Sequence, residues 1–113
     1  MPESLGAPVV RLDDTDDLDA LLEQEDRVLL DLYTSGCSLC QAIEPVLGNV
    51  ARARDDVTVA MANAGDDLDF VERYDVRSVP TLVLFDDGDV VAKLAEGFQG
   101  GDAVESFLDE HAE

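Results

Sequence analysis

Basic and bulky aromatic side chains are scarce in this chain of 113 residues. It has no tryptophan, a single lysine (Lys93) and a single histidine (His111). Only 7 lysines and arginines oppose 27 aspartates and glutamates, which leaves a formal net charge of −20. Nucleic acids and anionic lipid headgroups bind through basic side chains, so both kinds of partner are excluded. The acidic residues between Asp13 and Glu113 are scattered and not gathered in one block, which favours a solvated surface over an acidic docking tail.

Long apolar runs are also missing. No stretch approaches the roughly 20 apolar residues of a membrane helix. The first residues, MPESLGAPVV, lack the basic end and apolar core of a signal peptide. We therefore expect a cytoplasmic protein without a membrane partner. Because salt screens the repulsion between like charges, the acidic composition further predicts a surface of the halophile type, adapted to a salty cytosol.

Disorder and internal repeats are not indicated either. The chain has 8 glycines, 4 prolines and 46% apolar residues, which is typical of an ordinary globular protein. A chain of this length can bury one core without disulfide or metal staples. We expect a single domain over residues 1–113, with residues 1–7 as a loose lead.

Hydrophobic periodicity predicts strands that alternate with helices. A nearly all-apolar strand, Arg27–Tyr33, is expected at the centre of a sheet and is followed directly by a helix that begins at the cysteines. The other predicted elements are a strand at Val9–Leu12, a helix carrying Leu18, Leu21 and Leu22, a strand at Val57–Met61, a short helix ending near Tyr74, a hairpin from Thr81 onward with a turn at Gly88, and a last helix capped by Asp102 with Glu105 in a capping box. This order predicts an α/β fold in which a mixed sheet of about five strands is flanked by about four helices.

The only two cysteines, Cys37 and Cys40, lie in the segment TSGCSLCQAI. Residues three apart on a helix are close enough for a disulfide. Closing so short a loop stabilises the fold by only about 2 kcal/mol, so a structural role is a weak reason for the pair. A closed zinc site needs four ligands, which two cysteines and the distant His111 do not supply. A metal or iron–sulfur cluster bridging two subunits remains an alternative.

Thiol–disulfide exchange fits the pair better. The N–H groups and dipole at the start of a helix stabilise a thiolate, which is the species that attacks a disulfide. Cys37 is at the helix start and more exposed, so it is the expected nucleophile. Cys40, one turn deeper, is expected to resolve the mixed disulfide and leave an internal one.

Three segments, VLLDLYTSGCSLCQAIEPVL, VTVAMANA and YDVRSVPTLVLFDDGDVV, resemble the thioredoxin family in this order, from about Val28 to the C-terminus. The resemblance implies the thioredoxin fold and a protein-disulfide oxidoreductase without a bound cofactor, in which Cys37 attacks and Cys40 resolves. It also implies protein disulfides as substrates and a separate reductase as electron donor. We expect a monomer.

The resemblance assigns further residues to the site. Asp31 is implied as the buried acid behind the resolving thiol, and the alternation of the strand places it on an inward face. Burial favours its protonated form, so that it can accept and return the proton of Cys40. Pro80 is implied as a cis proline facing the disulfide, and Val79 as the residue that offers its backbone to an extended substrate.

Departures from the family pattern affect the substrate-facing surface. Gly36 stands where the family usually has a tryptophan, and Ser38 and Leu39 stand in place of Gly-Pro between the cysteines. We expect these three residues to contact substrate. Met61 replaces a lysine that in many members partners the buried acid. These differences leave a second interpretation, in which the fold serves as a binding or chaperone module with weak redox turnover.

Overall fold

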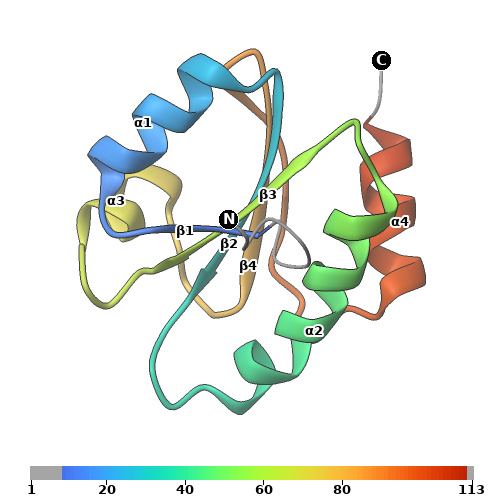
Figure 1. Cartoon of the computed structure of the whole chain (residues 1–113). Helices are drawn as coiled ribbons and strands as arrows, with labels where there is room; N and C mark the ends of the chain where they lie inside the picture. Colours follow the sequence, from blue (N-terminus) through green and yellow to red (C-terminus); the bar gives the residue numbers. More distant parts are fainter. Residues whose placement is uncertain (1–8, 112–113) are drawn as a thin grey trace, which may run out of the picture.

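The computed structural model of the chain describes residues 9–111, so the predicted loose lead at residues 1–7 lies outside the described residues. Strands and helices alternate along this range as the periodicity predicts (Figure 1). Their bounds are β1 Val10–Leu12, α1 Thr15–Gln24, β2 Arg27–Tyr33, α2 Ser38–Ala53, β3 Thr58–Asn63, α3 Asp69–Tyr74, β4 Thr81–Asp86, β5 Asp89–Leu94 and α4 Gly101–Glu110.

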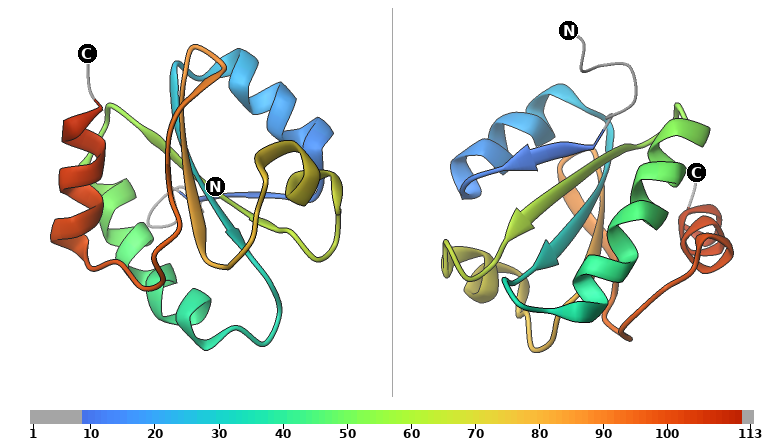
Figure 2. Two further views of the ribbon diagram at one scale, coloured as in Figure 1. Left: turned by 180° about the vertical axis from the view of Figure 1, so that it is seen from behind. Right: turned by 60° about the horizontal axis from the view of Figure 1, so that its bottom comes forward.

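The strands form one mixed five-stranded sheet in the order β1-β3-β2-β4-β5. Strands β1 and β2 run parallel to β3, whereas β4 runs antiparallel to both β2 and β5. Helices α1 and α3 cover one face of the sheet, and α2 and α4 cover the other (Figures 1 and 2). This arrangement confirms the predicted α/β layering.

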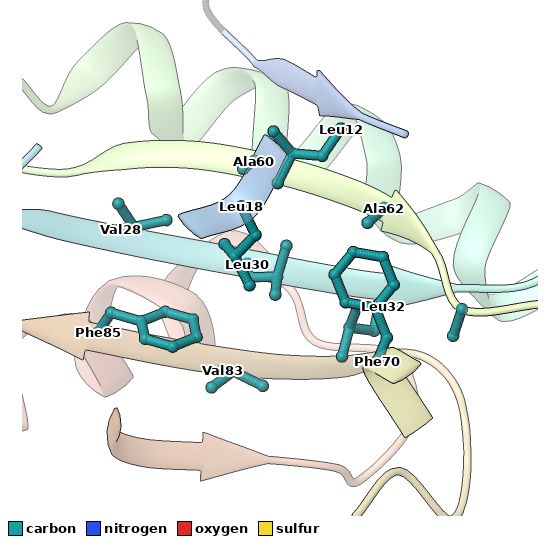
Figure 3. Close-up of a cluster of buried hydrophobic side chains, with 11 residues drawn as sticks. Leu12, Leu18, Val28, Leu30, Leu32, Ala60, Ala62, Phe70, Val83 and Phe85 are labelled. Atoms are coloured by element: carbon teal, nitrogen blue, oxygen red, sulfur yellow. The ribbon is translucent and has the colours of Figure 1, made fainter. Parts of the chain in front are cut away.

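Strand β2 lies at the centre of the sheet and divides the core into two clusters. Val28, Leu30 and Leu32 pack beneath α1 and α3, where Leu18 and Phe70 belong to the same first cluster (Figure 3). The alternate residues point to the other face, where Leu29 packs with the apolar stripes of α2 and α4. Asp31 shares that second face by alternation and is completely buried.

Helix α2 lies against the second face through one apolar stripe. Ile43, Leu47 and Val50 recur at helical spacing and are buried, as the sequence predicts. Pro45 lies inside the helix but outside this stripe, on its exposed side. None of the helices within residues 9–111 is both long and apolar enough to cross a membrane.

The predicted hairpin is formed by β4 and β5. Its two turn residues, Asp87 and Gly88, both have positive φ, at 54° and 85°. Two-residue turns of this kind match the twist of the paired strands, and glycine adopts the left-handed conformation without a steric penalty. The hairpin places β5 at the edge of the sheet.

The predicted cap of the last helix is wrong. Gly100, which has no side chain to cap with, is the N-cap of α4, whereas Asp102 lies in the first helical turn. Glu105 does not complete a capping box, because its carboxylate accepts a hydrogen bond from Arg54 at 2.8 Å. Both partners of this bond are ionised, whereas in a capping box only the carboxylate carries a charge.

Candidate active site

The two cysteines lie where α2 begins, at the edge of the sheet where β2 ends. Cys37 is the N-cap residue and Cys40 lies in the first turn. The two are joined by a disulfide with a Cα–Cα distance of 5.2 Å. The backbone N–H of Cys40 donates a hydrogen bond to Sγ of Cys37 at 3.1 Å. Cys37 is partly exposed and Cys40 is only 3% exposed, so the first cysteine is the more accessible of the two.

Gly36 shapes the turn between β2 and α2. Its φ of +78° lies in the left-handed region that favours glycine. Among the described residues, a Cβ atom at this position would meet no atom within 4 Å outside its immediate neighbours. The surface next to Cys37 is therefore open where the family usually carries a tryptophan. Ser38 and Leu39 are also exposed, so the three predicted substrate-facing residues surround the accessible sulfur.

The segment before β4 lies against the disulfide. The Val79–Pro80 peptide bond is cis, which confirms the implied conformation of Pro80. The carbonyl oxygen of Val79 lies 3.9 Å from Sγ of Cys37. The hydroxyl of Thr81, 1% exposed, donates a hydrogen bond to the carbonyl oxygen of Ser78 at 2.6 Å and so ties the two sides of this turn together. The backbone of Val79 is thus held beside the reactive sulfur.

A shallow groove of about 290 Å³ adjoins this turn. It runs between α3 and the segment before Pro80, and its lining is mostly apolar: Thr34, Ala64, Gly65, Leu68, Val71, Val76, Arg77, Ser78 and Val79. Sequence reasoning identified only Val79 among these residues. The sequence held one signal for this groove: Leu68 is an apolar residue within an acidic run. In the structure its side chain is 66% exposed.

A second apolar surface flanks the helix start. Leu39 and Phe98 are 46% and 45% exposed. A Cβ placed on Gly97 would lie 3.7 Å from Cδ1 of Leu39, so the loop before α4 passes close to one of the two residues between the cysteines. This proximity places Gly97 at the rim of the site.

Asp31 is the buried acid that the sequence predicts. The side chain is 0% exposed, and neither carboxylate oxygen has a hydrogen-bond partner among residues 9–111. The pKa of Asp31 is raised from 3.8 to about 7: burial is the largest cause, the negative charge of Glu44 also raises the pKa, and the positive charge of Arg11 lowers it. At neutral pH both the protonated and the ionised form of this carboxyl are therefore populated.

Two charged residues that sequence reasoning did not single out stand near the buried acid. Arg11 and Glu44 form an ion pair, and together with Cys40 and Met61 they line a small cavity of about 110 Å³. The signal for Arg11 was the alternation of β1, which turns Arg11 to the face opposite Leu12. The signal for Glu44 was its position four residues after Cys40 on α2. Within residues 9–111, no three His, Cys, Asp or Glu side chains gather as candidate metal ligands.

The geometry of the disulfide defines a class of protein. An accessible sulfur and a buried one can pair with little movement, so the site can accept or release two electrons by forming or breaking one S–S bond. A helix start supplies the N–H groups that stabilise the attacking thiolate. The chain is thus a dithiol–disulfide oxidoreductase on a mixed α/β sheet.

Comparison with known proteins identifies the family. The model of the thioredoxin family matches residues 9–110. The chain is 33% identical over 85 residues to a thioredoxin of Chlamydia pneumoniae, covering 75% of this chain and 82% of that protein. It is 38% identical over 73 residues to a thioredoxin of Pseudomonas aeruginosa, covering 64% and 68%. Among solved structures, a mutant thioredoxin from Halobacterium salinarum NRC-1 superposes with a TM-score of 0.85, at 32% identity and 95% coverage of both chains.

The chain therefore belongs to the thioredoxin family and has the thioredoxin fold. Its activity is thiol–disulfide exchange at a Cys-x-x-Cys active site. Membership in the family implies protein disulfides as substrates and a reductase as electron source. The fold and the activity predicted from the sequence are thereby confirmed.

Proposed function

We propose that this protein reduces disulfides of protein substrates, with Cys37 as the attacking and Cys40 as the resolving residue. The thiolate of Cys37 attacks one sulfur of the substrate disulfide, the substrate S–S bond breaks, and the released sulfur takes up a proton. Cys40 then loses its proton, attacks Sγ of Cys37 and releases the second substrate thiol. The substrate gains two electrons and two protons, and the protein is left with the Cys37–Cys40 disulfide. The difference in exposure between the two cysteine residues supports this division of roles.

Asp31 is proposed as the group that accepts the proton of Cys40 during resolution and returns it when the disulfide is reduced again. A group exchanges protons best when its pKa lies near the working pH. The pKa of Asp31 is raised to about 7, chiefly by burial. Its two oxygens have no hydrogen-bond partner in the described part of the chain, which leaves them free to take the proton. Both properties support an active role over a structural one.

The surface around Cys37 is proposed to bind an extended substrate segment. The backbone of Val79 pairs with it beside Pro80, as a strand added to a sheet edge pairs with its neighbour. Gly36, Ser38 and Leu39 contact the residues next to the substrate disulfide. The apolar groove that Val79 also lines accepts a side chain further along the segment.

The partners and the compartment follow from the same proposal. A separate reductase re-reduces the Cys37–Cys40 disulfide, and the protein acts as a monomer. The cytoplasm is the proposed compartment, because the reducing agents there keep dithiols reduced. The acidic surface argues against nucleic acid as a partner.

Trapping a reaction intermediate tests the division of roles. A Cys40→Ser variant mixed with oxidised insulin should accumulate a mixed disulfide through Cys37, because the resolving thiol is gone, and intact-protein mass spectrometry should detect the adduct. The matched Cys37→Ser variant retains only the buried sulfur and should form much less adduct. If Cys37→Ser forms the stable adduct instead, the roles are reversed.

Insulin reduction by the wild-type protein separates this function from the binding-module interpretation. With dithiothreitol as electron source in molar salt, the wild type should accelerate insulin precipitation, and neither single-cysteine variant should do so. Equal rates with and without the wild-type protein would favour a binding or chaperone module.

A further inference from the structure

Strand register places Arg11 and Asp31 in one row of the sheet. Arg11 of β1 pairs with Met61 of β3, and Asp31 of β2 pairs with the same Met61. Residues paired across neighbouring strands point to the same face of a sheet. Arg11, Met61 and Asp31 thus all face α2, and the backbones of the two charged residues are about 10 Å apart, which is two strand spacings. Met61, 2% exposed, fills the space between them and carries no charge.

The partner of Arg11 comes from α2. Glu44 forms an ion pair with Arg11. The side chain of Arg11 is 58% exposed and that of Glu44 is 44% exposed. Glu44 lies one helical turn after Cys40. Arg11, Glu44, Cys40 and Met61 line the same small cavity. The ion pair therefore stands between solvent and the layer that holds the resolving sulfur and the buried carboxyl.

The two members of the pair act on Asp31 in opposite directions. Glu44 raises the pKa of Asp31, and Arg11 lowers it. Both effects reach the carboxyl past the buried side chains of Met61 and Cys40, where charge is screened less than in water. As long as the pair is intact, the two effects oppose each other, and loss of either charge leaves the other acting alone.

We propose that Arg11 and Glu44 are positioning residues that together set the pH at which Asp31 and Cys40 exchange a proton. On this side of Asp31 the neighbouring strand β3 carries the neutral Met61. Arg11, on the next strand β1, supplies a positive charge there. Glu44 holds Arg11 over the cavity and offsets that charge. The inference rests on the proposed role of Asp31 in resolution.

The other groups that face Asp31 leave this pair as the chief charges in its surroundings. Strands β3 and β4 place the neutral Met61 and Leu82 on either side of it. Tyr33, two residues further along β2, points to the same face and lines the cavity. Helix α2 contributes Cys40 beside Glu44, and Cys37 precedes it, whereas α4 covers this face with apolar residues: Val104, Phe107 and Leu108.

The experiment follows the titration of Asp31 directly. Its side-chain carboxyl carbon is observed by NMR from about pH 4 to 10 in the oxidised protein, in the variants Arg11→Gln and Glu44→Gln and in the double variant. Arg11→Gln should move the titration midpoint up and Glu44→Gln should move it down, each by about half a pH unit or more. The double variant should return towards the wild-type midpoint. The pH at which insulin reduction reaches half of its maximal rate should shift in the same directions.

Matched controls come from the opposite face of the sheet. Arg73 and Asp19 form an ion pair at 2.8 Å between α3 and α1, so Arg73→Gln and Asp19→Asn change the net charge in the same way without facing Asp31. Both should leave the midpoint within about 0.2 pH unit of the wild type, because solvent screens charges on the far surface. Arg11→Lys retains the positive charge, so it should keep the wild-type midpoint even where Arg11→Gln folds poorly.

The outcomes distinguish this inference from the proposed function. The role of the pair would be overturned if Arg11→Gln and Glu44→Gln moved the titration midpoint in the same direction or by no more than the controls do. It would also be overturned if the pH dependence of the rate did not move. Asp31→Asn tests the underlying function, since it should remove the inflection from the rate profile. If that inflection persists in Asp31→Asn, the proposed role of Asp31 in proton exchange is wrong. If it disappears in Asp31→Asn while the pair variants keep the inflection at the wild-type pH, only the role of the Arg11–Glu44 pair is excluded.

Discussion

Asp31 stands out in the described part of the molecule because its buried carboxyl has no hydrogen-bond partner. Asp31 is fully buried and neither of its oxygens accepts a hydrogen bond from residues 9–111, although buried polar groups are almost always paired. Ionising it in place costs free energy, because the surrounding leucine and methionine side chains cannot solvate the charge. The residue is thus retained at the expense of stability.

This cost predicts how stability depends on pH. The pKa of Asp31 is about 7 in the folded protein against 3.8 for a solvated carboxyl. Between these values the folded state holds a proton that the unfolded state has released, so the contribution of Asp31 to stability is full below about pH 4 and is lost as the pH rises through 7. Asp31→Asn should be more stable than the wild type by up to about 4 kcal/mol above pH 8, and the gain should vanish near pH 4.

Urea unfolding of the oxidised proteins at a series of pH values measures this difference. Asp89→Asn, at an exposed position at the start of β5, is the matched control and should show no such pH-dependent gain. A gain for Asp31→Asn that is the same at pH 4 and pH 8 would mean that ionisation of Asp31 is not the cause.

The residues of the site differ in how readily the sequence reveals them. Cys37 and Cys40 are the only cysteines, and Asp31 is an acid inside an apolar strand, so each stands out from its own context. Arg11 and Glu44 do not stand out, because charged residues are common in this chain. Their meeting depends on the order β1-β3-β2 and on the register of these strands, which local periodicity does not determine.

At the scale of elements, one arginine connects the end of α2 to α4. Arg54 is the C-cap residue of α2, and its side chain, 14% exposed, forms ion pairs with three carboxylates: Asp56, Glu105 and Asp109. Arginine suits this position because its planar guanidinium can donate to several acceptors at once. Helices α2 and α4 are thereby held together at the end remote from the disulfide.

Removing this connection should lower stability measurably. Arg54→Met retains the apolar part of the side chain but leaves three carboxylates facing one another. We expect a loss of about 1–2 kcal/mol, between the values for exposed and buried ion pairs. Urea unfolding measures it at low ionic strength. Arg77→Met is the matched control, since the Arg77–Asp75 pair is 84% and 66% exposed and should contribute little. Equal losses in the two variants would contradict the connecting role of Arg54.

Elements were easiest to predict where one local signal dominates. The bounds of β2, Arg27–Tyr33, agree with the prediction because the strand is apolar on both faces and charged or polar residues stand on either side. The start of α4 was mispredicted because Asp102 and Glu105 have capping-box spacing, yet Glu105 is taken by Arg54, which lies 51 residues away in sequence. A long-range ion pair outweighed a local motif there.

At the scale of the whole molecule, negative charge is in large excess. Within residues 9–111, ion pairs join acidic residues to arginines that include Arg11, Arg27, Arg54, Arg73 and Arg77. The 27 acidic residues far outnumber the 7 basic ones, so most acids repel their neighbours. Such repulsion destabilises a compact state and is screened by salt over about 10 Å at 0.1 M.

Stability should therefore rise with ionic strength. Thermal unfolding followed by circular dichroism should give a midpoint that is several degrees higher in molar KCl than in dilute buffer, since a gain of about 1 kcal/mol raises the midpoint of a domain this size by roughly 4–8 °C. An uncharged osmolyte at equal osmolality serves as the control for general effects of the solute. Equal midpoints in dilute buffer and in molar salt would rule out the proposed adaptation to a salty cytosol.

The two faces of the central sheet also differ in how freely their residues can be substituted. The cluster beneath α1 and α3 is hydrocarbon throughout, whereas the disulfide, the buried acid and its charged neighbours all belong to the side of α2. Leucine, valine and phenylalanine on the first side that do not line the groove beside α3 can be exchanged for residues of equal volume without altering the chemistry across the sheet. Repacking that half offers a way to tune the melting temperature of this oxidoreductase while its reactivity stays as it is.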